Sequence, residues 1–197
     1  CRGNIGLTPA DYFGRTLVEK LPQNIKVGVI NVAVGGCSIN LFDEDKCTDY
    51  IAEAAGWLQG FCRQYDNNPF RRLVECGKEA QKVGVIKGIL IHQGCTDNTQ
   101  PDWPDRVNLV YTRLLKELGL NAEDVPLLIG ELMHKEQGGV CHAHNEVIAR
   151  TPQVIPTAHV VSSAGCPGAP DGLHFTAEGY RMLGRNYANV MLQLLKK

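Results

Sequence analysis

Short apolar segments that alternate with helical patterns constrain the fold of this chain most strongly. Each segment is rich in Val, Ile or Leu, and most end in Gly or small residues, which is typical of strands buried on both faces of a parallel sheet. The segments are Lys26–Val34, Val85–His92, Val125–Leu132 and Thr157–Ser163. This alternation predicts an α/β fold with three α/β/α layers, a parallel sheet and right-handed crossovers.

Apolar residues recur at helical spacing between and after these strands. The last predicted helix begins after Thr176, a good N-cap, and Glu178 suits the positive end of its dipole. The predicted helices are Pro9–Leu21, Asn68–Val83, Trp103–Leu118 and Thr176–Leu195. The stretch Phe42–Asn67 is polar, with Gly and Cys, and we expect an irregular insertion or long loop there.

The first predicted helix occupies an unusual position. Thr8 caps it and Pro9 fills its first turn, but in a doubly wound sheet such a helix normally follows a strand. We therefore expect a strand to be missing on the N-terminal side, and the start at Cys1 without Met suggests a processed or partial chain. The length fits one domain over residues 1–197.

Charge and composition narrow the class of partner. Lys and Arg total 20 against 21 Asp and Glu, with no basic run, so neither nucleic acid nor a membrane surface is expected as a partner. No apolar stretch reaches the roughly 18 residues that span a bilayer. The eight cysteines favour disulfides and a secreted or periplasmic protein, and without a C-x-x-C pair a zinc site is not expected.

Ligands of open α/β sheets bind at the carboxyl ends of the strands, and here these ends carry functional residue types. They read Gly35-Gly36-Cys37-Ser38, His92-Gln93-Gly94-Cys95-Thr96-Asp97, Gly130-Glu131 and, before the last helix, Asp171-Gly172-Leu173-His174.

Asp171 and His174 form the sharpest pair. A spacing of three within one turn lets the carboxylate reach the Nδ1–H of the imidazole, which fixes the tautomer and stabilises the imidazolium. The Nε2 atom is then free to act as a general base toward a hydroxyl nucleophile. The alternative is a surface turn in which Asp171 only caps the helix entry.

Gly35, Gly36, Gln93 and Gly94 are candidate oxyanion donors. Glycines after a buried strand allow a close backbone approach to a ligand, and Gln93 adds a side-chain amide. Ordinary tight turns are the alternative for both glycine motifs.

Together these strand ends resemble the SGNH hydrolases. The resemblance is strongest to the acetyl xylan esterases of carbohydrate esterase family 6 and the related sialic-acid acetylesterases, and it covers nearly the whole chain. The blocks that carry it are Thr8–Phe13, Val29–Ile39 (VINVAVGGCSI), His92-Gln93-Gly94, Asp171-Gly172-Leu173-His174-Phe175 and Tyr180–Gly184.

The resemblance implies an ester hydrolase that removes acetyl groups from xylan or a related polysaccharide or oligosaccharide, without metal or organic cofactor. Asp171 and His174 match the acid and base of the family's triad. Gly36 and Gln93 match its oxyanion donors. Cys141 and Cys166 resemble positions that the family also fills with Cys and are expected to form a disulfide, and Cys47 with Cys62 is a second candidate pair.

Two departures from the family pattern leave alternatives open. The family's nucleophilic serine lies in a Gly-Gln-Ser-Asn block ahead of the first helix, and neither that block nor a Gly-x-Ser-x-Gly elbow occurs here. Cys95 also replaces the Glu that usually follows His-Gln-Gly. The serine is then supplied by a separate N-terminal segment, or the chain is an inactive sugar-binding remnant, or Ser38 or Cys95 is the nucleophile.

Other residues admit two interpretations each. His142 and His144 could ligate a metal, although exposure is the commoner state of such a pair. Trp103 and Tyr65 could stack on sugars, although a tryptophan at a helix start more often belongs to the core. Glu131 either faces the cleft or is hydrogen-bonded beside it.

Overall fold

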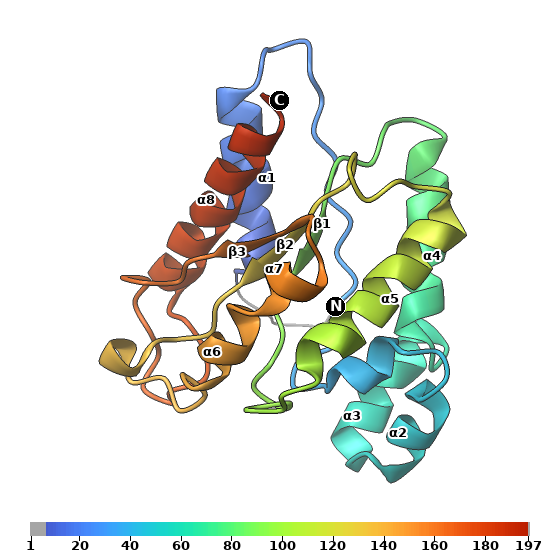
Figure 1. Ribbon diagram of the computed structural model, residues 1–197, viewed down its shortest axis with the longest axis vertical. Helices are drawn as coiled ribbons and strands as arrows, with labels where there is room; N and C mark the ends of the chain where they lie inside the picture. Colours follow the sequence, from blue (N-terminus) through green and yellow to red (C-terminus); the bar gives the residue numbers. More distant parts are fainter. Residues whose placement is uncertain (1–6, 197) are drawn as a thin grey trace.

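The computed structural model describes residues 7–196 and confirms the α/β architecture (Figure 1). Strands β1 (Ile89–Ile91), β2 (Leu127–Gly130) and β3 (Ala158–Val161) form a parallel sheet in the order β1-β2-β3. Strand β2 lies at the centre of the sheet, and its first residue, Leu127, pairs with Ile89 on one side and Ala158 on the other. All residues of β2 are buried, as expected for a central parallel strand.

The helices are listed here with their bounds: α1 (Pro9–Lys20), α2 (Cys47–Glu53), α3 (Gly56–Cys62), α4 (Pro69–Gln81), α5 (Trp103–Leu118), α6 (His144–Ile148), α7 (Thr151–Val154) and α8 (Ala177–Leu194), with 3₁₀ turns η1 (Ile39–Phe42), η2 (Arg63–Tyr65) and η3 (Lys135–Gln137). All the predicted helices are present. Thr176 caps α8 by accepting the Gly179 N–H at 3.1 Å, as the sequence predicts.

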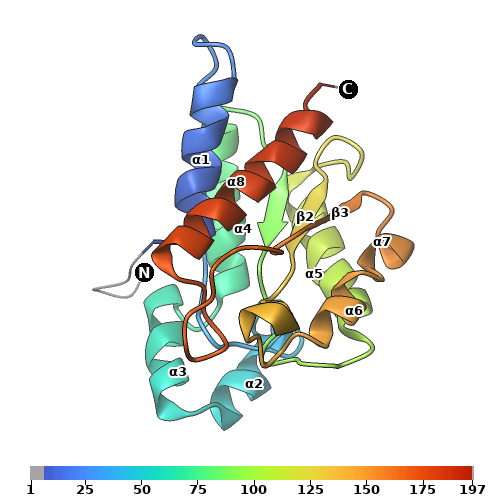
Figure 2. The same cartoon turned by 90° about the vertical axis from the view of Figure 1, so that its left-hand side faces the viewer.

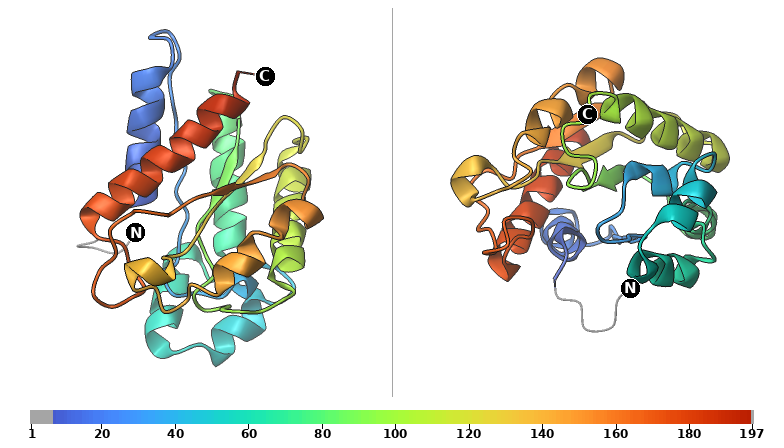
Figure 3. Two further views of the ribbon diagram at one scale, coloured as in Figure 1. Left: turned by 60° about the vertical axis from the view of Figure 1, so that its left-hand side comes forward. Right: turned by 90° about the horizontal axis from the view of Figure 1, so that it is seen from below.

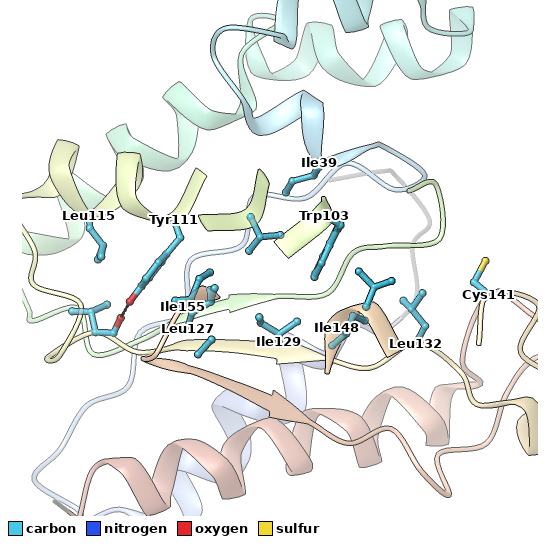
Figure 4. Packing of buried hydrophobic residues seen from close by; sticks show 14 residues of the cluster. Ile39, Trp103, Tyr111, Leu115, Leu127, Ile129, Leu132, Cys141, Ile148 and Ile155 are labelled. Carbon is cyan, nitrogen blue, oxygen red and sulfur yellow. Dashed lines mark hydrogen bonds between the residues drawn. The ribbon is translucent and has the colours of Figure 1, made fainter. Parts of the chain in front are cut away.

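Successive residues of β2 point to opposite faces of the sheet, and they therefore belong to two separate hydrophobic cores. Leu127 and Ile129 pack with residues of α5, α6 and α7, including Trp103 and Tyr111 (Figure 4). Leu128 packs on the other face against α1 and α8, which lie side by side in Figures 1 and 2. The sheet is therefore covered on both faces.

The prediction of a buried strand at Lys26–Val34 is wrong. This segment contains no strand, and Val29 and Ile30 are 43% and 41% exposed. Figure 3 shows it as a plain trace between α1 and η1. A strand needs a neighbour with free N–H and C=O groups, and among residues 7–196 no strand pairs with the outer edge of β1.

Two further boundaries differ from the prediction. The stretch Phe42–Asn67 is not irregular, because α2 and α3 fold around a small core of their own that includes Leu41, Leu58 and Cys62. Each of these helices has only 7 residues, which is too short for a clear helical periodicity in the sequence. The strand predicted from Val85 begins only at Ile89, and Val85 itself is 77% exposed.

Within residues 7–196, no helix has both the length and the apolar character that a membrane crossing requires.

Candidate active site

Asp171 and His174 form a hydrogen-bonded pair in the loop between β3 and α8. The Asp171 Oδ2 atom lies 2.7 Å from His174 Nδ1, and Oδ1 accepts the backbone N–H groups of Leu173 and His174, each at 2.9 Å. These hydrogen bonds hold the pKa of the Asp171 carboxyl well below its usual range. The carboxylate is therefore ionised and orients the ring, and the His174 side chain is 67% exposed.

The loop that carries this pair is braced by the segment after β2. The Val140 N–H donates to the Gly172 carbonyl at 3.0 Å, and the Ala169 N–H donates to the His174 carbonyl at 2.7 Å. Gly172 has φ +69°, and a Cβ there would lie 2.8 Å from the Gly138 carbonyl oxygen. Only glycine satisfies both the left-handed backbone and this close approach.

The other predicted strand ends meet at the same edge of the sheet. The Thr96 hydroxyl donates to the Gly36 carbonyl at 2.9 Å, which joins the turn at Gly35-Gly36 to the loop after β1. The Asp171 carboxylate lies close enough to Cys95 to raise the pKa of that thiol. In Figure 2, β1 points toward the end of the molecule where α2, α3 and α6 gather.

Asp97 organises this edge, although its role could not be predicted from the sequence. Its carboxylate accepts the Ser38 hydroxyl at 2.6 Å, the Ile39 N–H at 2.7 Å and the Gln93 Nε2–H at 2.7 Å. Arg106 balances its charge from 3.7 Å. The only signal in the sequence is an acidic residue close behind a predicted buried strand, which does not distinguish support from catalysis.

Gln93 is held by three neighbours. Its Nε2 group donates to the Cys37 carbonyl at 3.0 Å as well as to Asp97, and its Oε1 accepts the Trp103 indole N–H at 2.6 Å. The side chain thus ties the two glycine-bearing loops together. The backbone N–H of the exposed Gly36 donates no hydrogen bond to another described residue, so it is available to a ligand. Gly94 is buried, and a Cβ there would clash with the His144 ring.

Comparison with known proteins agrees with this geometry. The family model described as carbohydrate esterase, sialic acid-specific acetylesterase, matches residues 2–193. The chain belongs to this family. A crystal structure of a protein from Arabidopsis thaliana has the same fold, with a TM-score of 0.73 and 20% sequence identity over 98% of this chain and 71% of that chain. Carbohydrate acetylesterase activity is the property of the family as a whole.

Neither candidate nucleophile within this carbohydrate esterase chain is suited to attack an ester. Ser38 is buried, donates its hydroxyl to Asp97 and accepts the Asn40 N–H at 3.2 Å, so it caps η1. Burial is the main reason why the pKa of the Cys95 thiol is raised to about 12, and the neighbouring Cys141 adds to the shift. Almost no thiolate is then present at neutral pH. No serine, threonine or cysteine in residues 7–196 hydrogen-bonds the His174 ring.

The cysteines of the carbohydrate esterase do not pair as predicted. Cys141 and Cys166 are separate buried thiols, and so are Cys47 and Cys62. Cys47 and Cys62 do share one small core with Cys37. Cys1 lies outside the described residues.

The two candidate metal histidines differ in their surroundings. His142 is exposed, whereas His144 is fully buried, accepts the Thr99 N–H on Nδ1 at 3.1 Å and packs edge-on against Trp103. No cluster of three or more potential metal ligands occurs in the described part of the chain. Glu131 is hydrogen-bonded, to the His134 ring at 2.7 Å and to the Ser162 hydroxyl at 3.0 Å.

The aromatic residues near the site also separate clearly. Trp103 is fully buried and belongs to the core, and the Tyr65 hydroxyl donates to the Ala33 carbonyl at 3.2 Å. Trp57, which the sequence analysis did not single out, is 53% exposed. Its ring lies 3.0 Å from the position that a Cβ on Gly36 would occupy. An exposed tryptophan beside a candidate oxyanion donor could not be recognised without the fold.

Proposed function

We propose that this chain is the acid–base part of a serine-type carbohydrate esterase that removes O-acetyl groups from xylan or a related polysaccharide. The observation that carries the proposal is the Asp171–His174 pair at the strand edge that also presents the unpartnered N–H group of the exposed Gly36. Acyl transfer requires a base and an oxyanion site together.

In this mechanism a serine hydroxyl attacks the acetyl carbonyl carbon while His174 Nε2 accepts the hydroxyl proton. Asp171 stays ionised and stabilises the imidazolium. The Gly36 N–H group and the N–H of the attacking serine stabilise the oxyanion, and Gln93 keeps the two glycine-bearing loops in register. The imidazolium returns its proton to the leaving sugar oxygen. A water molecule, deprotonated by His174, then attacks the acetyl-serine and releases acetate.

The serine comes from a segment outside these residues in this proposal. Ser38 and Cys95 are occupied or un-ionised, and the outer edge of β1 is unpaired within residues 7–196. A parallel strand placed on that edge would end beside Gln93, because the carboxyl ends of parallel strands meet at one edge. A residue following such a strand would therefore lie at the same edge of the sheet as the Asp171–His174 loop.

Trp57 provides the surface for the sugar. Its exposed ring lies next to Gly36, so a pyranose ring stacked on it would place an O-acetyl group near the oxyanion donors. Aromatic side chains supply large contact areas at small entropic cost.

The test compares acetate release by this chain with release by a longer chain that includes the encoded residues ahead of Cys1. We expect the longer chain to carry a Gly-Gln-Ser-Asn block and to be active on acetylated xylo-oligosaccharides and on an aryl acetate. His174→Ala should lower that activity by about 10³-fold or more. Equal rates for His174→Ala and the parent would remove the assigned base.

A substrate series tests the carbohydrate part of the proposal separately. Trp57→Ala should raise KM for the acetylated oligosaccharide by about threefold to tenfold and leave the aryl acetate unaffected, whereas Trp57→Phe should keep the stacking surface. Parallel assays on O-acetylated sialic acid decide between the two sugar classes. An equal loss on both kinds of substrate would argue against sugar stacking.

A second candidate is a sugar-binding remnant without catalysis, because His174 has no nucleophile beside it in the described residues. This candidate predicts no Gly-Gln-Ser-Asn block upstream, no acetate release, and sugar binding that Trp57→Ala weakens. Activity abolished by thiol alkylation would instead identify Cys95 as the nucleophile.

A further inference from the structure

Cys95 and Cys141 contact one another beside the acid–base pair. Cys141 Sγ lies 3.7 Å from the Cys95 carbonyl oxygen, and the Cys95 side chain packs against the same apolar cluster that contains Cys141. The residues are 46 positions apart in the chain, so the fold alone brings them together. Cys166, the partner that the sequence analysis assigned to Cys141, instead lies with Phe13 and Leu183 in the core on the other face of the sheet.

Both thiols belong to loops that shape the site. Cys95 follows Gly94 at the carboxyl end of β1. Cys141 follows Val140, whose N–H donates to the Gly172 carbonyl within the Asp171–His174 loop. A bond between the two sulfurs would therefore connect the loop after β1 to the segment that braces the acid–base pair.

We propose that Cys95 and Cys141 are a disulfide-forming pair that, when oxidised, fixes the Asp171–His174 loop against the carboxyl end of β1. The proposal concerns the reaction of two thiols and holds whether or not the chain hydrolyses esters. It gives Cys95 a function of its own at the position where the related esterases usually have a glutamate.

A small disulfide, such as oxidised glutathione, is the oxidant in this reaction. Cys95 is half-buried and Cys141 is buried, so the Cys95 thiolate attacks the small disulfide first. It forms a mixed disulfide and expels one thiolate. The Cys141 thiolate then attacks Cys95 Sγ and expels the second. Two protein thiols are oxidised, one disulfide is reduced to two small thiols, and these carry away both protons.

The local environment favours a stable product with slow formation. Burial raises the pKa of the Cys95 thiol to about 12, so the reduced state gains no stability from ionisation, which makes the disulfide hard to reduce. The same shift keeps the reactive thiolate scarce. The rate of oxidation should therefore rise by about tenfold for each pH unit between 7 and 9.

The test is thiol mapping of the folded chain after equilibration with oxidised glutathione. Free thiols are blocked with N-ethylmaleimide, the protein is digested without reduction, and cross-linked peptides are identified by mass spectrometry. We expect one peptide pair that joins Cys95 to Cys141. Oxidation should raise Tm by on the order of 10 °C and slow amide exchange in the segment around Val140 and Gly172.

Two serine variants serve as matched controls. Cys166→Ser should leave the cross-link and the gain in Tm intact, whereas Cys95→Ser should abolish both while remaining folded by circular dichroism. A Cys141–Cys166 peptide would overturn the proposal, and so would alkylation of both Cys95 and Cys141 in the fully equilibrated folded protein. None of these measurements depends on acetate release, so their failure is distinct from failure of the proposed esterase.

Discussion

Replacement of Asp97 by alanine tests whether this carboxylate holds the candidate site together. The change removes the acceptor of the Ser38 hydroxyl, the Ile39 N–H and one Gln93 N–H, all within 2.7 Å. It also takes away the least exposed carboxylate partner of Arg106, since Asp97 is only 6% exposed. The buried donors would each lose an acceptor, and the partly buried Arg106 would lose its nearest carboxylate.

The expected cost follows from these contacts. Loss of one member of a buried, hydrogen-bonded charge pair costs about 3–5 kcal/mol, and Gln93 and Arg106 keep second acceptors in Cys37 and Asn40, which favours the lower half of that range. For a chain of this size, a cost of 3–4 kcal/mol corresponds to a fall in Tm of about 6–16 °C.

The assay is urea and thermal unfolding followed by circular dichroism. Asp102→Ala is the matched control, because Asp102 also faces Arg106, at 3.9 Å, but is 61% exposed. We expect that control to change the free energy of unfolding by less than about 0.5 kcal/mol. If the free energy of unfolding of Asp97→Ala were within about 1 kcal/mol of the parent value, the reasoning would be refuted, because the loss of three hydrogen bonds to a buried carboxylate should cost more than that.

Two further predictions concern the site and its support. Gly172→Ala should destabilise the chain by about 2–3 kcal/mol, because φ is +69° at this position and the new Cβ would meet the Gly138 carbonyl. Gly165→Ala is the control and should cost only about 1 kcal/mol, because φ is +75° there but the space around it is open. Equal free energies of unfolding for the two variants in urea would remove the steric part of the argument. Burial lowers the pKa of His144 below 6.5, so the folded state favours the neutral ring, and stability should be full above about pH 6.5 and fall below it as the unfolded chain takes up the proton. His144→Phe should flatten that part of the stability–pH curve, and an unchanged slope would show that other groups cause it.

The sequence was most informative where many residues repeat one pattern. The apolar faces of α5 and α8 each span several turns, so the helices were predicted within a residue or two. The Asp171–His174 pair was also accessible, because three residues within one turn fix its geometry almost independently of the rest of the fold. Contacts between residues far apart in the chain carried no such signal. Asp97 accepts a hydrogen bond from Ser38, which is 59 positions away in the sequence. The ring of Trp57, a residue of α3, contacts Gly36.

The segment Lys26–Val34 shows the limit of pattern alone. Its composition is that of a buried strand, yet whether it pairs depends on a neighbour, and β1 leaves its outer edge unpaired within residues 7–196. Cys141 illustrates the same limit, because it contacts Cys95 rather than the cysteine that the resemblance suggested.

The sequence by itself determined the α/β class, the main helices and the hydrogen-bonded pair Asp171–His174, because local periodicity and short-range spacing depend on neighbouring residues only. The tertiary structure alone decided that Ser38 supports Asp97, that Gln93 ties two loops together and that Cys95 faces Cys141. These contacts arise when the crossovers bring separate strand ends to one edge of the sheet, and the free energy that selects them comes from burying the whole core rather than from any single segment.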